Sequence, residues 1–294
     1  MMLDIQSFVS KARVSDGAWG TQMQLVGLAA GAAPELWNTE NPDGVQAVAA
    51  SYVEAGSDVI LTNTFGANRF VLARHGATDR AAELNETGVA ISRRAAGADV
   101  KVFASVGPTG KIVMMEEVPN AEIVAAYEEV AKAIEAGGAD AIVMETFNEL
   151  AEVELALEGL AKGCSLPVIC SMTFDSGPDK SATNMGTTPA DLVRVATAAG
   201  AAGVGANCGI GPENYVHIAE LLRTATDLPV WIKANAGLPQ LGPDGKTFFP
   251  MGPEEFAGYV PAIIEAGANI LGGCCGTTPD HIRMVRARID KINA

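Results

Sequence analysis

Three cysteines stand where their thiols can meet. Cys274 and Cys275 are adjacent in the glycine-rich segment Gly-Gly-Cys-Cys-Gly-Thr-Thr-Pro, and Cys208 stands in a second such segment, Gly-Ala-Asn-Cys-Gly. Neighbouring side chains on a regular strand point to opposite faces, so adjacent thiols converge only where the backbone bends, and the flanking glycines permit a bend. Three thiolates with an open fourth position make a sensible catalytic zinc site.

The same residues allow other interpretations. Buried cysteines are often inert apolar side chains, and an adjacent pair can form a strained disulfide. The turn before Pro279 can instead bind a phosphate at a helix N-terminus. The spacing alone leaves zinc and these alternatives open. Cys164, in a connecting loop, and Cys170, inside a strand, are interpreted as structural.

Zinc held by three thiolates would favour thiol chemistry. Such a centre keeps a net negative charge, which makes it a poor Lewis acid for activating water. A substrate thiol that enters the fourth position loses its proton and becomes a nucleophile at neutral pH. Water-activating sites generally use histidine and carboxylate ligands, and His75, His217 and His281 lack ligand spacing. The residues therefore favour attack by a substrate sulfur on an electrophilic carbon.

Polar residues at other strand ends suit a small amino-acid substrate. Asp16 and Glu145 each end a predicted strand, and either carboxylate can hold an ammonium group by a charge-assisted hydrogen bond. The backbone amides from Gly17 to Gly20 can receive a carboxylate. Taken singly, each of these residues is more often a loop or cap residue, and only their shared face favours a site. Three asparagines at or near further strand ends can orient polar groups: Asn63, Asn207 and Asn235.

Short apolar segments alternate along the chain with amphipathic, alanine-rich segments. The predicted strands are residues 13–16, 58–63, 101–106, 141–145, 167–172, 203–207, 229–233 and 269–272. The predicted helices are residues 44–54, 79–95, 121–136, 150–161, 189–199, 213–224, 253–266 and 279–291. Asp43 is predicted to cap the first helix, Thr188 and Thr278 to cap the fifth and eighth, and Pro261 to kink the seventh.

Eight strand-then-helix units in series predict an α/β fold, a single (β/α)₈ TIM barrel over residues 1–294. A doubly wound open sheet uses the same alternation, but no glycine-rich dinucleotide fingerprint follows the first strand. Long segments follow several strands (107–120, 174–188 and 236–252), whereas the segments before strands are short. Because βα loops open on the C-terminal face of a barrel, we expect the site there.

Composition excludes several classes of partner. The chain of 294 residues has 35 acidic and 20 basic side chains, a formal net charge of −15, so binding along a nucleic-acid backbone is not expected. No apolar stretch is long enough for a membrane span, and the first residues lack the pattern of a signal peptide. Five cysteines with an adjacent pair do not form a disulfide framework. We expect a reduced, cytoplasmic protein.

Eight short segments, spread over nearly the whole chain, resemble the homocysteine S-methyltransferase family. The resemblance implies that Cys208, Cys274 and Cys275 hold zinc and that the sulfur of homocysteine completes the tetrahedron. It also implies that Asp16 and Glu145 contact the amino-acid part of homocysteine. The segments that carry it are residues 16–18, 20–21, 62–67, 107–110, 145–146, 207–208, 235–237 and 272–279.

The resemblance leaves the methyl donor open. The segments at 107–110, 145–147 and 172–174 are most similar to the homocysteine module of cobalamin-dependent methionine synthase. Betaine-using members place tyrosine after the acid that matches Glu145, and Thr146 here disfavours an aromatic cage for a quaternary ammonium.

We therefore expect a free-standing module that makes L-methionine from L-homocysteine by in-line displacement, with the methyl group supplied by a separate corrinoid protein. Betaine or S-methylmethionine is the alternative donor. A non-catalytic zinc or redox thiol protein is the alternative of another class.

Overall fold

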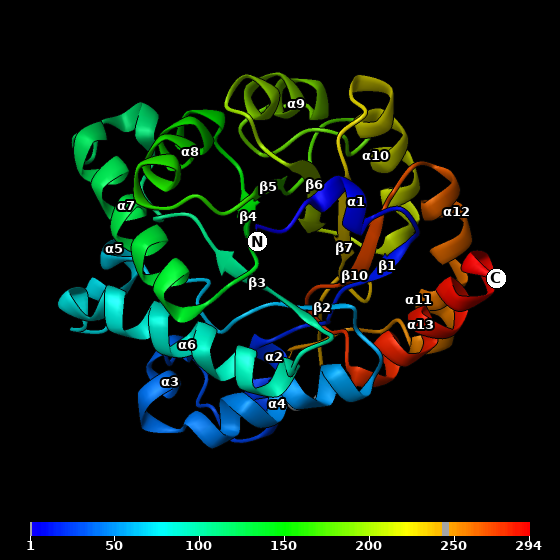
Figure 1. Cartoon of the computed structure of the whole chain (residues 1–294). Helices are drawn as coiled ribbons and strands as arrows, with labels where there is room; N and C mark the ends of the chain where they lie inside the picture. The colour runs from blue at the N-terminus through cyan, green and yellow to red at the C-terminus, as the bar shows by residue number, and fades with distance from the viewer. Residues whose placement is uncertain (1, 243–246) are drawn as a thin grey trace.

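The chain folds into an eight-stranded parallel barrel surrounded by helices, in a computed structural model that describes residues 2–242 and 247–294 (Figure 1). The predicted TIM barrel is thus confirmed. Its strands are β1 (Arg13–Val14), β2 (Val59–Ile60), β3 (Lys101–Val106), β4 (Ala141–Phe147), β5 (Val168–Met172), β6 (Gly203–Cys208), β7 (Val230–Ala234) and β10 (Ile270–Gly273).

Every ladder of the barrel is parallel, in the order β1-β10-β7-β6-β5-β4-β3-β2. Within the described ranges β1 and β2 share no ladder, but Asp58 bridges them. Its backbone N–H donates to the Val14 carbonyl at 2.8 Å, and its carboxylate accepts from the Val14 N–H at 2.8 Å. Because all eight strands run in one direction, their carboxyl ends gather at one mouth.

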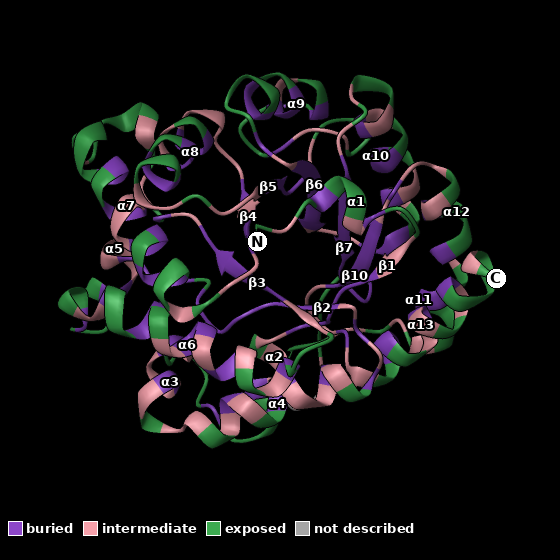
Figure 2. Ribbon diagram, viewed as in Figure 1, coloured by how far each residue is buried: buried purple, intermediate pink, exposed green. Residues whose placement is uncertain are grey.

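The predicted helices form the outer layer, with their buried faces turned toward the strands (Figure 2). They are α4 (Pro42–Glu54), α6 (Ala81–Ala96), α7 (Asn120–Gly137), α8 (Leu150–Gly163), α9 (Pro189–Ala198), α10 (Pro212–Ala225), α11 (Pro253–Gly258) with α12 (Val260–Glu265), and α13 (Pro279–Asn293).

Two details of the helix prediction need correction. The cap of α4 is Asn41, whose side chain accepts from the Gly44 N–H at 3.2 Å, and Asp43 lies inside the first turn because the helix begins earlier than predicted. The predicted kink at Pro261 is a break into two helices, since proline fits the first turn of a new helix better than a helix interior. Thr188 caps α9 as predicted, with its hydroxyl accepting from the Asp191 N–H at 3.3 Å.

Several short elements between the barrel units were not predicted, because pieces of two to six residues carry no usable periodicity. They are α1 (Ile5–Phe8), α2 (Gly20–Leu25), α3 (Trp37–Glu40), α5 (Arg69–Ala73), the 3₁₀ turns Pro34–Leu36, Thr78–Arg80 and Val113–Met115, and the hairpin of β8 (Gln240–Leu241) with β9 (Thr247–Phe248). That hairpin falls in the predicted loop 236–252, of which residues 243–246 lie outside the described residues.

The barrel interior is packed below the mouth. Trp231 stacks on Phe103 with ring centroids 6.0 Å apart, and Ile5 of α1 packs into the same cluster. A larger apolar cluster fills the space between strands and helices. Because the interior is filled, ligands have access from the carboxyl ends of the strands.

None of the helices in the described ranges combines the length and the apolar character of a membrane span.

Candidate active site

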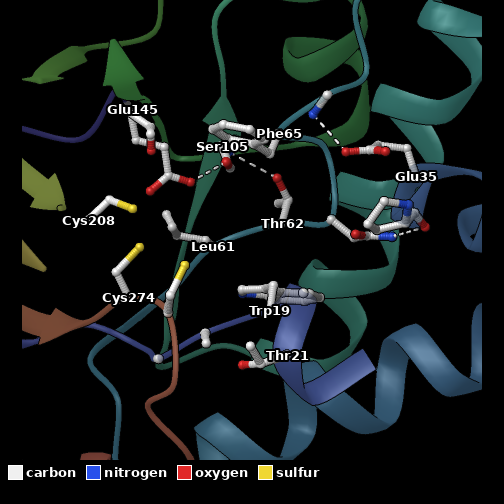
Figure 3. A pocket seen from close by; sticks show the side chains of 18 of the residues that line it. Trp19, Thr21, Glu35, Leu61, Thr62, Phe65, Ser105, Glu145, Cys208 and Cys274 are labelled. Atoms are coloured by element: carbon white, nitrogen blue, oxygen red, sulfur yellow. Dashed lines mark hydrogen bonds between the residues drawn. The ribbon is translucent and has the colours of Figure 1, made fainter. Parts of the chain in front are cut away.

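The three predicted cysteines come together at the barrel mouth. The sulfurs of Cys208, Cys274 and Cys275 all lie within 4.8 Å of one another, and all three are free thiols (Figure 3). Tetrahedral sulfur ligands at zinc–sulfur distances of about 2.3 Å stand about 3.8 Å apart, so this spacing suits zinc. Soft thiolate donors favour the same metal. Of the earlier alternatives, the structure shows no disulfide between the adjacent pair.

The backbone bends that the glycines predicted are present. After β10 the Cys274 N–H donates to the Ala234 carbonyl at 2.7 Å, and the Thr277 N–H returns to the Cys274 carbonyl at 3.1 Å. Gly276 closes this turn with a φ of +81°. Cys208 itself has a φ of +67°, in the left-handed region that side chains rarely adopt. These turns aim the thiols of two strands at one point.

The thiol cluster favours one thiolate and two thiols. Hydrogen bonds from Cys274 and Cys275 lower the pKa of Cys208 to about 3. The bond to Cys208 raises the pKa of Cys274 to about 12, and bonds to Cys208 and Cys274 raise the pKa of Cys275 still further. Three thiolates at this spacing need a cation between them, and a divalent metal supplies that charge.

Asn207 links the cysteine strand to the strand of Glu145. Its Oδ1 accepts from the Thr146 N–H at 2.9 Å and from the Ser171 hydroxyl at 2.6 Å, while its Nδ2 donates to the Thr146 hydroxyl oxygen at 2.7 Å. Thr146 has a φ of +64°, and the β4–β5 register is irregular between Met144 and Phe147. This irregularity lies at Glu145, and Asn207 holds it in place.

Glu145 presents a buried carboxylate to the cavity. Its side chain is 8% exposed and accepts a hydrogen bond from the Ser105 hydroxyl (Figure 3). Burial raises the pKa of Glu145 to about 7; nearby Cys274 adds to the rise and Lys233 opposes it. A carboxylate short of partners in a low-dielectric site is a strong acceptor for a ligand N–H.

Asp16 is placed differently, with its acceptors already occupied inside the protein. Its Oδ1 accepts from Lys233 Nζ at 2.6 Å and from the Ser15 hydroxyl at 3.2 Å. Its Oδ2 accepts from Trp19 Nε1 at 2.7 Å and from the Leu61 N–H at 2.7 Å. A carboxylate offers about four lone-pair sites, and all four are used. The predicted contact between Asp16 and a substrate ammonium stays a prediction.

The remaining predicted residues lie close to these groups. Gly17 lines the cavity, and a Cβ there would lie 2.8 Å from the Tyr52 ring, so glycine is required by space. Asn235 is buried; its Nδ2 donates to the Gly209 carbonyl at 2.9 Å, while its Oδ1 has no partner among the described residues. Asn63 is structural, since its Nδ2 donates to the Pro34 carbonyl at 2.7 Å.

A cavity of about 570 Å³ opens beside the sulfurs. From the cysteines it runs past Glu145 and between Trp19 and Phe65 toward Glu35 (Figure 3). Glu35 is 4% exposed, accepts from the Gly66 N–H at 2.6 Å, and has a pKa raised by burial. The volume lies in the range of pockets for ligands larger than one amino acid.

Several residues of the cavity were not predicted from the sequence, among them Trp19, Glu35, Ser105 and Lys233. A signal existed for Lys233, which is the single charged residue in the otherwise apolar segment Val-Trp-Ile-Lys-Ala of β7. No comparable signal marks Glu35, which stands in a short helical turn between β1 and β2.

Comparisons with known proteins show which proteins the chain is similar to. A family model described as "Homocysteine S-methyltransferase" matches residues 13–289. Methionine synthase of Mycobacterium tuberculosis is 35% identical over 310 aligned residues, covering 99% of this chain and 25% of that protein. The Mycobacterium leprae enzyme is 32% identical, with 98% and 25% covered. The chain therefore spans about a quarter of the length of these curated relatives.

A solved structure supports the fold. The metallated form of the homocysteine methyltransferase MmuM from Escherichia coli superposes with a TM-score of 0.79 at 23% identity, covering 97% of this chain and 100% of that one.

Proposed function

Because the chain belongs to the homocysteine S-methyltransferase family, we propose that it methylates the thiol of L-homocysteine to give L-methionine, with zinc held by Cys208, Cys274 and Cys275. The observation that carries the proposal is the meeting of three free thiols, within 4.8 Å of one another, at the wall of a cavity lined by a buried carboxylate.

Zinc, when bound, would supply the charge that lets the substrate thiol ionise at neutral pH. The substrate sulfur then attacks the donor methyl in line: a sulfur–carbon bond forms, the bond between methyl and donor breaks, and its electron pair stays with the donor. The thiol proton leaves to solvent. The walls of the cavity contribute by orienting the sulfur and by excluding water.

Glu145 is the residue we assign to the ammonium group of homocysteine. Its carboxylate faces the cavity and accepts only from Ser105 among the described residues. Asn235 stays a predicted substrate contact: its Oδ1 has no partner among the described residues, but Asn235 is not one of the residues that line the cavity. Gly17 and the residues that follow it do line the cavity. Asp16 contributes to the proposed substrate site indirectly: its carboxylate accepts hydrogen bonds from Lys233 and Trp19 and so fixes these two side chains at the cavity.

For the donor we propose a methylcorrinoid carried by a protein. The similarity to methionine synthases supports it, and so does the surface around the mouth. Apart from Met2 and Ile292, the large apolar side chains exposed within the described ranges all lie in segments that follow a barrel strand, and these segments open on the mouth. They are Leu25, Val26, Phe65, Ile112, Met114, Met115, Met185, Leu238, Leu241 and Phe248.

A small cationic donor, betaine or S-methylmethionine, is the second candidate. The observation in its favour is the far end of the cavity, where the path between the Trp19 and Phe65 rings leads to the buried carboxylate of Glu35. Aromatic faces and a carboxylate attract sulfonium and quaternary ammonium groups.

A donor assay tests these proposals on the reduced, zinc-loaded protein. We expect methionine from L-homocysteine and a methylated corrinoid protein, and none from betaine or S-methylmethionine alone. Turnover with either small donor alone would select the second candidate. With cobalt in place of zinc, homocysteine should change the thiolate-to-cobalt absorption. Metal binding that homocysteine leaves unchanged, without turnover from any donor, would instead indicate a non-catalytic thiol protein.

A further inference from the structure

Lys233 places a buried ammonium group at the wall of the cavity. The residue is 1% exposed and lines the cavity beside Cys274 and Glu145. Among the described residues its Nζ forms a hydrogen bond with Asp16 alone, at 2.6 Å. An ammonium group has three N–H donors, so two of them have no partner in the part of the chain that the structure describes. Leaving donors unpaired in a buried position costs free energy, which a ligand acceptor would recover.

The register of the ladders places Lys233 one residue below the level of the cysteine strand ends. Lys233 pairs in register with Asn207 on one side and with Gly272 on the other, one residue before the level of Cys208 and Gly273. A thiol ligand held at the cysteines therefore shares the cavity with the side chain of Lys233.

Lys233 and Glu145 form a pair of opposite charges on the same cavity. They make no ion pair with each other in the described part of the chain, since the partner of Lys233 is Asp16 and that of Glu145 is Ser105. Each is nevertheless close enough to influence the charge of the other. The head of an α-amino acid carries an ammonium and a carboxylate on one carbon, which is the complementary arrangement.

With Glu145 already assigned to the ammonium group of the substrate, we propose that Lys233 binds its α-carboxylate and that Asp16 acts as the positioning residue that fixes Lys233. This inference rests on the proposed function and names how its substrate is recognised. The alternative is that Lys233 only compensates the negative charge of Asp16 and the thiolates. That alternative predicts no preference for ligands with a carboxylate.

Three thiols test the assignment on the zinc-loaded protein, with binding measured by calorimetry. L-homocysteine carries both charges, 3-amino-1-propanethiol lacks the carboxylate, and 4-sulfanylbutanoate lacks the ammonium. We expect the wild-type protein to bind L-homocysteine about 10–100-fold more tightly than 3-amino-1-propanethiol, the range of a charge-assisted hydrogen bond. Equal affinity for these two thiols would overturn the proposal without any variant.

Lys233→Gln should remove that preference, bringing the two affinities within about threefold, while zinc stays bound in equal stoichiometry. The matched variant Glu145→Gln should instead remove the preference for L-homocysteine over 4-sulfanylbutanoate and keep the preference for a carboxylate. The double variant Asp16→Asn/Lys233→Gln removes both charges of the buried Asp16–Lys233 pair together, so it repeats the measurement should the single variant fold poorly.

Parallel losses of affinity for L-homocysteine and 3-amino-1-propanethiol in Lys233→Gln would assign the lysine to charge compensation and overturn the proposal. In that case methylation of homocysteine by the wild-type protein would still support the proposed function. A wild-type protein that binds none of the three thiols would overturn both.

Discussion

The two ends of the cavity are built from different parts of the fold. At one end, three thiols, Glu145 and Lys233 project from strands or from the first residues after strands. At the other end, Glu35 stands in a 3₁₀ turn and is fixed by the N–H of Gly66, in the loop after β2. The barrel ladders hold the first end, whereas short helices and turns hold the second. The groups of the proposed chemistry are thus placed on the hydrogen-bonded ladders of the barrel.

This difference leads us to expect that the two ends can be changed independently. Substitutions at the sulfur end should remove metal or homocysteine. Substitutions at the Glu35 end should leave both in place and alter only stability or the use of a small donor.

The largest effect is expected for Cys275→Ser. Because serine provides no thiolate, the site would lose one of its three proposed ligands, and zinc affinity and turnover should each fall by at least about a hundredfold. Zinc content after gel filtration and methionine formation are the measurements. Cys164→Ser is the matched control, since Cys164 lies half-buried at the end of α8. Full zinc content in Cys275→Ser would contradict the assignment of the ligands.

Glu145→Gln should act on the substrate and leave the metal in place. Glutamine keeps an acceptor for the Ser105 hydroxyl but removes the charge, so homocysteine affinity should fall about 10–100-fold. Calorimetric titration of the zinc-loaded variant measures this loss. Exposed Glu86→Gln on α6 controls for the change of an acid. Unchanged affinity would remove Glu145 from the substrate site.

A matched pair of glycine substitutions compares the two ends directly. A Cβ on Gly273 would lie 2.4 Å from Thr277 Oγ1, and Thr277 cannot move freely because that oxygen accepts from Ala18 and donates to the Cys274 carbonyl. Gly273→Ala should therefore cost about 1–3 kcal/mol of unfolding free energy and weaken zinc binding roughly tenfold.

Gly66→Ala provides the other half of the pair. A Cβ on Gly66 would lie 2.9 Å from Glu35 Oε1, so the variant should be destabilised without losing zinc. Denaturant titration and competition with a chelating dye measure the two effects. Equal weakening of zinc binding in both variants would show that the ends are coupled.

The sequence predicts the sulfur end of the cavity better than the Glu35 end. The barrel and the cysteine trio were predictable because strand ends of a parallel barrel must converge, so residues at those ends can be grouped without knowing distances. The end at Glu35 was not predictable, because turns of three to six residues leave no periodic pattern in the sequence.

The sequence also could not separate the two acids. Asp16 and Glu145 both end predicted strands, yet the structure fills the acceptors of one and leaves the other facing the cavity. One of the four donors that fill Asp16 is Lys233, which lies 217 residues from Asp16 along the chain. Its charge within an apolar strand was visible, but its partner depended on the closure of the barrel.

The smallest expected effect is a pH-dependent change in stability from Glu35→Gln. Burial raises the pKa of Glu35 in the folded protein above its unfolded value, so the folded state binds more protons and stability falls as pH rises through that interval. Glutamine keeps the acceptor for the Gly66 N–H but does not ionise. The variant should match the wild-type Tm near pH 4 and exceed it by a few degrees at pH 7.5, with zinc and homocysteine affinities unchanged. Thermal unfolding at the two pH values measures this difference.

Two further measurements on Glu35→Gln test the comparison of the two ends. A loss of homocysteine affinity as large as that of Glu145→Gln would contradict the separation of the two ends. A higher KM for S-methylmethionine alone would place a cationic donor beside Glu35.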